Sequence, residues 1–288
     1  AEKDTRDRVG VAAQAARSMI HLDPDQVSAA RQGDRAALAS VVKSLQGPVL
    51  RLALRMLAHP ADAEDATQEI LIQIITHLGT VRDDRAAGGW ALKVATRHLV
   101  GMRKRSRVEA MRMSFKDFAD DLEHGLVDAE GDQAESAITA IAIEEIKVGC
   151  TLAMLTCLSR SLRIAYVLGD IFEMSDSEAA EALEISATAY RQRLSRARQE
   201  VTRFVKTHCG IVAQTAACRC EKRLTAARAS GRITLGAPAF PLTSPACDIR
   251  DLRRRIRTLE EGRRAAALIR SNPDFPTNVG DLILEAMK

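Results

Sequence analysis

The segment Ser175–Glu200, SDSEAAEALEISATAYRQRLSRARQE, carries the strongest fold signal in this sequence of 288 residues. Its apolar positions fit two helices that cross at a short turn, as in a helix-turn-helix. These positions are Ala179, Ala180, Leu183, Ile185, Tyr190, Leu194 and Ala197. Glu184 stands where such turns commonly hold glycine, and a left-handed backbone there costs a non-glycine residue about 1 kcal/mol. We therefore predict a helix-turn-helix with a slightly remodelled turn.

The second helix of this segment is predicted to bind DNA. Arginines recur along it, and guanidinium groups pair with phosphates and with guanine edges. Ser186 and Thr188, near its start, are placed to donate to a phosphate at the helix N-terminus. The predicted contacts are Ser186, Thr188, Arg191, Arg193, Arg196 and Arg198. An ordinary solvated arginine-rich helix is the alternative, and the preceding scaffold helix favours DNA binding.

The composition of the whole chain favours an all-α protein in the cytoplasm. Only 3% of the residues are aromatic, and the residues that dominate lose little rotamer freedom in a helix. Basic and acidic residues number 42 and 38, so the placement of charge matters more than the net +4. No stretch approaches the roughly 20 apolar residues that span a bilayer, and the first residues, AEKDTRDRVG, are charged where a signal peptide would be apolar. We expect no membrane insertion.

Breaks in the apolar pattern divide the chain into two helical domains with flanking segments. Residues 1–24 are an N-terminal extension, and 25–110 form a helical domain with breaks at Gly47-Pro48, His59-Pro60 and Gly88-Gly89. Acidic residues accumulate where the periodicity weakens, so 111–136 is predicted to be a solvated acidic linker. Residues 137–207 form the second domain, interrupted near Ser159 and at Ile185-Ser186. Residues 208–288 form a C-terminal extension.

Within the first domain, the helix expected over 62–78 is amphipathic. Ala66, Ile70, Leu71, Ile74 and Leu78 form its apolar side. Asp62, Asp65, Gln68 and Glu69 fall on another face, which offers an acidic stripe to a basic partner. The alternative is that the acids at the N-terminus complement the helix dipole.

The helix that begins at Trp90 carries cations suited to a DNA backbone. Lys93, Arg97 and Lys104 share one stripe, and Arg103 follows the same helix. Trp90 is the chain's single tryptophan. Its indole either lines a functional site or buries its large apolar area in the core.

Three segments occur in an order that resembles a known family. They are DAEDATQEILIQIITHL (Asp62–Leu78), GGWALKVATRHLVGMRKR (Gly88–Arg105) and LSRSLRIAYVLGDIFEMSDSEAAEALEISATAYRQRLSRAR (Leu158–Arg198). Together they resemble the extracytoplasmic-function group of bacterial sigma factors, in the sigma-70 family. The resemblance covers roughly residues 25–206. It implies an initiation factor rather than an enzyme, with core RNA polymerase and promoter DNA as partners and an anti-sigma factor as a further candidate.

The resemblance also implies roles for the residues already singled out. Residues 25–110 would be the region-two domain and 137–207 the region-four domain. The face with Asp62, Asp65, Gln68 and Glu69 would dock on the clamp of the largest polymerase subunit. Trp90, Lys93, Arg97, Arg103 and Lys104 would contact the minus-ten element, and the helix-turn-helix the minus-thirty-five element. Arg97 and Gly101 stand where the family often has asparagine and aspartate, which puts the minus-ten base preference in doubt.

The C-terminal extension begins with a cluster of possible metal ligands. His208, Cys209, Cys218 and Cys220 would suffice for a tetrahedral zinc ion if the loop between them folds back, and no other cofactor is expected. A redox-sensitive thiol cluster and unreactive free cysteines are the alternatives. Further along, Ile249, Leu252, Ile256 and Leu259 predict one basic helix from about Asp248 to Arg270 with a narrow apolar seam. We expect the extension to regulate the chain in cis.

Three other functions compete with initiation. A sigma-like decoy that binds an inhibitor needs no DNA-binding charge, and the basic helices argue against it. A stand-alone helix-turn-helix regulator needs no acidic face such as Asp62–Glu69. An enzyme is disfavoured because no Ser-His-Asp constellation, phosphate-binding glycine loop or metal-hydrolase motif stands out.

Overall fold

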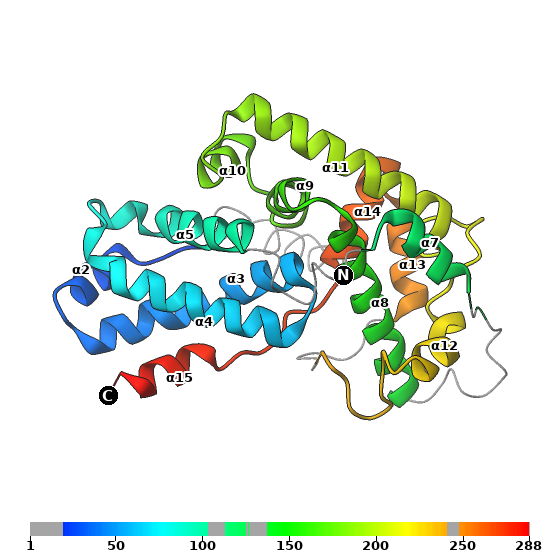
Figure 1. The fold of residues 1–288 in the computed structure, drawn as a ribbon, viewed down its shortest axis with the longest axis horizontal. Coiled ribbons are helices and arrows are strands. Elements are labelled where there is room, and N and C mark those ends of the chain that lie inside the picture. Colours follow the sequence, from blue (N-terminus) through cyan, green and yellow to red (C-terminus); the bar gives the residue numbers. More distant parts are fainter. Residues whose placement is uncertain (1–19, 103–112, 125, 127–136, 241–247, 288) are drawn as a thin grey trace, which may run out of the picture.

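The computed structural model describes residues 20–102, 113–124, 126, 137–240 and 248–287, and these residues form an all-α protein, as predicted (Figure 1). Within these ranges the one extended pairing is an isolated bridge between Cys209 and Cys218. In the same ranges, none of the helices combines the length and apolarity needed to cross a bilayer.

The first domain is a bundle built around a long central helix. It contains α2 (Pro24–Arg31), α3 (Arg35–Leu57), α4 (Pro60–His77) and α5 (Ala87–Gly101), with short 3-10 turns η1 (Leu78–Thr80) and η2 (Asp84–Ala86) before α5. Asp23 and Asp34 cap α2 and α3, because each carboxylate accepts backbone N–H groups from the first turn of its helix. The predicted break at His59-Pro60 is confirmed, since α3 ends at Leu57 and His59 caps α4.

Two predicted breaks in this domain are wrong. Pro48 lies inside the continuous helix α3, where Leu45, Val49 and Leu52 are fully buried, so packing outweighs the loss of one backbone N–H. The Gly88-Gly89 pair lies inside α5 rather than before it. A Cβ at Gly88 would come within 2.5 Å of the Ile20 carbonyl oxygen, so this glycine serves close packing and not a turn.

The acidic segment between the domains contains a packed helix, which corrects the prediction of a solvated linker. Helix α7 (Phe115–Glu123) begins with a capping box made by Ser114 and Asp117. Phe118 is buried and its ring stacks on that of Phe204, with 5.2 Å between centroids. The apolar face of α7 therefore covers the second domain, while Asp117, Asp120 and Glu123 are exposed.

The second domain packs a helix-turn-helix on the short helix that precedes it. It consists of α8 (Ala137–Cys157), α9 (Arg160–Tyr166), a π-helical turn η4 (Val167–Ile171), α10 (Asp176–Ala182) and α11 (Ala187–His208). The predicted interruption near Ser159 is confirmed, because α8 ends at Cys157 and α9 begins at Arg160. Buried Arg163 of α9 joins the two domains by donating to the Met56 carbonyl at the end of α3.

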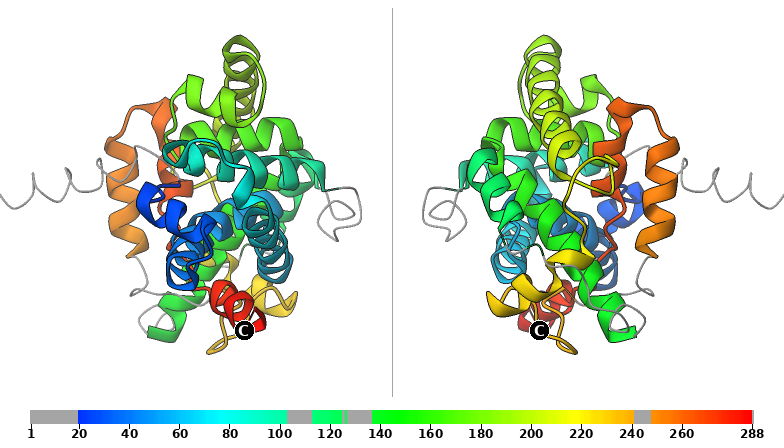
Figure 2. Two further views of the ribbon diagram at one scale, coloured as in Figure 1. Left: turned by 90° about the vertical axis from the view of Figure 1, so that its left-hand side faces the viewer. Right: turned by 90° about the vertical axis from the view of Figure 1, so that its right-hand side faces the viewer.

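The C-terminal extension is spread over both domains instead of forming a separate unit. After η5 (Glu221–Arg223) and α12 (Leu224–Ala229), it comprises α13 (Ile249–Thr258), α14 (Glu261–Arg270) and α15 (Val279–Ala286). The single helix predicted from Asp248 to Arg270 is therefore two helices, which meet at Leu259. Side views show α11 and α15 on opposite sides of the molecule (Figure 2).

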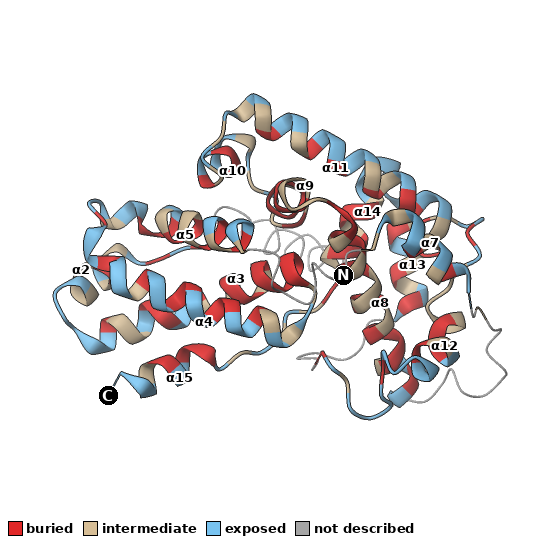
Figure 3. Cartoon of the chain, viewed as in Figure 1, coloured by how far each residue is buried: buried red, intermediate tan, exposed pale blue. Residues whose placement is uncertain are grey.

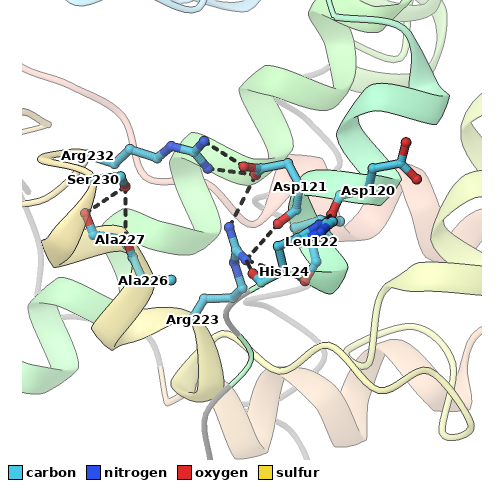
Figure 4. Close-up of polar contacts among 9 residues, drawn as sticks. All are labelled: Asp120, Asp121, Leu122, His124, Arg223, Ala226, Ala227, Ser230 and Arg232. Carbon is cyan, nitrogen blue, oxygen red and sulfur yellow. Dashed lines mark hydrogen bonds and ion pairs between the residues drawn. The ribbon is translucent and has the colours of Figure 1, made fainter.

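A charged network ties the extension to α7 (Figure 4). Asp121 accepts two hydrogen bonds of 2.7 Å from Arg232 and one of 3.2 Å from Arg223. The buried guanidinium of Arg223 also donates to the backbone carbonyls of Asp121 and His124. These hydrogen bonds, those from Arg232 above all, lower the pKa of the Asp121 carboxyl below its usual 3.8.

We expect the substitution Asp121→Asn to reduce the free energy of unfolding by about 1–2 kcal/mol at pH 7, because it leaves the buried Arg223 without its charged partner. A carboxyl whose pKa is lowered by folding stabilises the protein above pH 3.8, and this stabilisation is lost as the pH falls through the lowered value. Urea denaturation should therefore give the same difference between wild type and variant at pH 7 and pH 5, and a smaller one at pH 3. An equal difference at all three values would contradict this assignment.

Candidate polymerase-binding and DNA-binding surfaces

Helix α4 presents the predicted polar stripe to solvent. Its first turn is held by His59, whose Nδ1 accepts from the Asp62 backbone N–H at 3.3 Å. The apolar side is buried as predicted, at Ala66, Ile70, Leu71, Ile74 and Leu78. On the opposite side Asp65, Gln68 and Glu69 are exposed and Asp62 is half-buried. We call these four residues the α4 polar face; it has the negative charge that a basic partner requires.

A pocket of about 710 Å³ lies between α4 and α5. Trp90, Val94, Arg97 and His98 line it from α5, and Glu69 lines it from α4. Trp90 is half-buried, so it packs against the core and also lines the pocket. His98 lies 3.4 Å from the Glu69 carboxylate; burial lowers the pKa of this histidine, and Glu69 opposes that effect. The pocket combines a flat aromatic side chain with a cation, a combination that suits an unstacked base.

The two predicted minus-ten cations that the structure describes are paired with the helix-turn-helix. Lys93 Nζ lies 2.9 Å from Glu181 Oε1, and Arg97 donates to both oxygens of Glu184 at 2.8 and 2.7 Å. Between them, Thr96 Oγ1 donates to the Ala182 carbonyl at 2.8 Å. We call this set of bonds the α5–α10 contact. Arg103 and Lys104 lie outside the described residues.

The helix-turn-helix has the local features expected from its sequence. A capping box of Ser175 and Glu178 begins α10, and the Ser186 hydroxyl accepts from the Ala189 N–H at the start of α11. Glu184 has φ 55°, so this non-glycine residue adopts the left-handed backbone whose cost led us to predict a slightly remodelled turn. Tyr190 fixes α11 on α9 by donating from its buried hydroxyl to the Ala165 carbonyl at 3.1 Å.

The predicted DNA contacts on α11 differ in their exposure to solvent and in their ion pairs within the chain. Ser186, Thr188, Arg191 and Arg196 are exposed, and much of the surface of α11 is exposed (Figure 3). Arg193 is half-buried and lines a crevice of about 280 Å³ with Arg97 and Glu184. Arg198 donates from Nε to both carboxylate oxygens of Asp170, at 2.9 and 3.0 Å, and thereby pins α11 on η4. Arg191 and Arg196 are thus the most accessible cations of the predicted set.

The four predicted zinc ligands do not assemble, which corrects that prediction. His208 turns away toward α7, where its Nδ1 lies 3.7 Å from Glu123 and its ring packs on Phe204. The backbones of residues 209–210 and Cys218 approach closely, and the Gly210 N–H donates to the Cys218 carbonyl at 3.0 Å. This approach is possible because Gly210 has no Cβ to obstruct it. Among the residues that the structure describes, no three histidine, cysteine or acidic side chains are arranged to hold a metal ion.

The three cysteines at the start of the extension are instead half-buried, and this burial disfavours ionisation of their thiols. Burial raises the pKa of the Cys209, Cys218 and Cys220 thiols, that of Cys218 to about 11. Cys150 of α8 belongs to the same cluster, and burial raises its pKa too. Because the thiolate is the reactive form, these values favour the unreactive alternative over the redox-sensitive one. The sequence held no signal for Cys150, which lies 59 residues before Cys209.

Comparison with known proteins gives two family matches in the order predicted. The family model described as Sigma-70 region 2 matches residues 41–108, and the one described as Sigma-70, region 4 matches residues 149–201. The chain is also similar to the ECF RNA polymerase sigma factor SigE of Mycolicibacterium smegmatis. The two are 29% identical over 191 residues, which are 64% of this chain and 68% of the relative.

Proposed function

Because this chain belongs to the extracytoplasmic-function group of the sigma-70 family, whose members are initiation factors and not enzymes, we propose that it binds core RNA polymerase and directs initiation at specific promoters. The observation that carries the proposal is the presence, in one chain, of an exposed acidic face on α4 and an exposed basic recognition helix, α11. A decoy regulator needs only the first of these surfaces and a stand-alone DNA-binding regulator only the second.

The α4 polar face is proposed as the contact with polymerase. Asp65, Gln68 and Glu69 project from a helix whose other side is fully buried, so the face is rigid before binding. A rigid acidic face complements a basic surface on the partner and favours fast association. Asp62, half-buried beside His59, would both orient the start of α4 and join the contact.

The two DNA-binding surfaces are proposed to lie on α5 and α11. Lys93 and Arg97 would contact the minus-ten element, together with Arg103 and Lys104, and the pocket beside Trp90 would receive an extruded base. Ser186, Thr188, Arg191, Arg193 and Arg196 would contact the minus-thirty-five element, with Arg198 holding α11 in place from behind.

Run-off transcription with purified core polymerase tests this proposal. Fragments of genomic DNA are transcribed by core alone and by core with saturating amounts of this chain. We expect discrete start sites only in the second reaction. A decoy or a stand-alone regulator would give none, and the absence of discrete starts at saturation would contradict the proposed function.

A further inference from the structure

Helix α14 attaches the C-terminal extension to the second domain. Glu261 pairs with Lys206 of α11, and Arg270 pairs with Glu173, just after η4. Immediately after α14, the Ser271 carbonyl accepts from the buried Lys147 of α8 at 2.9 Å. Asn272 donates to Thr151 of the same helix at 2.8 Å. The last two contacts come from the buried side chains of Lys147 and Asn272, so α14 is firmly attached to the second domain.

The same segment then crosses to the first domain, where α15 lies against α3 and α4 (Figure 1). Val279 and Ile283 are its buried residues on that side. The Gly280 N–H donates to Gln46 Oε1 at 2.9 Å, and Asp281 lies 3.9 Å from Lys43. A groove of about 260 Å³ separates α15 from α4, and Gln68 of the α4 polar face is one of its lining residues.

The segment that contains α14 and α15 is attached to the second domain by α14 and to the first domain by α15. It therefore limits how far the two domains can separate. Residues 271–278 connect the two helices, and a stretch of that length spans at most roughly 30 Å when fully extended. Elements at minus ten and minus thirty-five lie roughly 80 Å apart along B-form DNA, at about 3.4 Å per base pair. Binding both elements is therefore easier once one of the two attachments has been released.

When the two domains are closed together, the cations proposed to contact the promoter are engaged in ion pairs within the chain. In the α5–α10 contact, Lys93 is paired with Glu181 of α10, and Arg97 is paired with Glu184 of the turn that follows α10. These cations can neutralise DNA phosphates only after they leave Glu181 and Glu184, because a carboxylate and a phosphate compete for the same guanidinium or ammonium. A closed chain should therefore bind promoter DNA more weakly than an open one.

We propose that residues 261–287, here called the clamp segment, hold the two sigma domains closed, and that release of α15 from α3 and α4 opens the chain for polymerase and promoter. This inference rests on the proposed function. It goes beyond that function by placing α15 of the same chain beside the α4 polar face, the proposed contact with polymerase.

Of the two attachments, the one between α15 and the first domain is the one that can be released. It is eight residues long, too short to stay helical alone, and Leu282 on it remains 54% exposed. Its ion pair to Lys43 joins two side chains that are each 62% exposed, so it contributes little. Because α14 is anchored by buried Lys147 and Asn272, opening should leave α14 on the second domain.

The substitution Gly280→Leu tests the clamp in the full chain. A Cβ at this position would come within 2.5 Å of Gln46 Oε1 and 3.0 Å of Val42, so a leucine displaces α15 while every residue of both sigma domains stays unchanged. The matched control is Gly262→Leu in α14, where no atom lies within 4 Å of the added Cβ. A second displacing variant, Ile283→Asp, places a charge at a buried position of α15.

Two measurements are made on wild type and all three variants: the affinity for core polymerase, and the hydrogen exchange of backbone amides in residues 279–286. We expect faster exchange and about tenfold tighter binding for Gly280→Leu and Ile283→Asp, because the apparent affinity rises with the fraction of open chain. Gly262→Leu should match the wild type. Faster exchange without tighter binding would overturn the clamp.

Failure of the clamp can be told apart from failure of the proposed function. If the clamp is wrong and the sigma function is right, wild type and variants give the same discrete start sites with the same half-saturating concentration. If the sigma function is wrong, no form of the chain gives discrete starts at any concentration.

Discussion

Replacement of Arg191 and Arg196 by alanine together is expected to lower promoter-specific transcription about 100-fold. Each arginine that contacts a base edge contributes about 1–3 kcal/mol, and two losses near 1.4 kcal/mol multiply to a factor of roughly 100. Both side chains are exposed, and the nearest carboxylate to Arg191, that of Asp176, is 3.9 Å away. The fold should therefore survive the change. Run-off yield from one promoter, with core polymerase saturated, measures the effect.

A double variant that removes the same charge elsewhere is the control. Arg203→Ala with Arg228→Ala takes two exposed arginines from the far half of α11 and from α12. We expect its yield to stay within threefold of the wild type. An equal fall in both double variants would mean that α11 acts only through bulk charge, and no fall in either would remove α11 from promoter binding.

Features that depend on neighbouring residues were predicted from the sequence. The two helices of the helix-turn-helix follow from apolar spacing, and the place of the turn residue Glu184 follows from where such turns commonly hold glycine. The buried and exposed sides of α4 follow in the same way from a period of 3.6 residues. In each case the interactions that decide the structure lie within one or two helical turns.

Features that depend on distant residues were not predicted. Lys93 and Glu181 are 88 residues apart, and Arg198 and Asp170 are 28 apart, so no periodic pattern links them. Pro48 remains in a helix because the surrounding core holds it there, a tertiary effect that overrides local preference. The proposed zinc site failed for a related reason, since the direction of His208 is set by Phe204 and Glu123 on packed helices.

Charge reversal on the α4 polar face should have an effect at least as large as the loss of the recognition arginines. We expect Asp65→Lys with Glu69→Lys to weaken binding to core polymerase more than 100-fold, because like charges across an interface cost several kcal/mol. The two residues are four apart on one helix, so the double variant keeps a like-charged pair and changes only its sign. Asp65 and Glu69 lie beyond the first turn of α4, where the helix dipole has little effect, so the change should leave the helix folded.

The control for this reversal is Asp25→Lys with Asp120→Lys, two exposed carboxylates on α2 and α7. Binding to core, measured by titration at 0.1 M salt, should fall only for the α4 variant, while its circular dichroism melting curve stays close to that of the control. At higher salt the difference should shrink, because exposed charges are screened over about 10 Å at 0.1 M and about 3 Å at 1 M. Unchanged binding would mean that Asp65 and Glu69 are ordinary solvated residues of α4, and the polymerase contact would then have to be sought on another surface of the first domain.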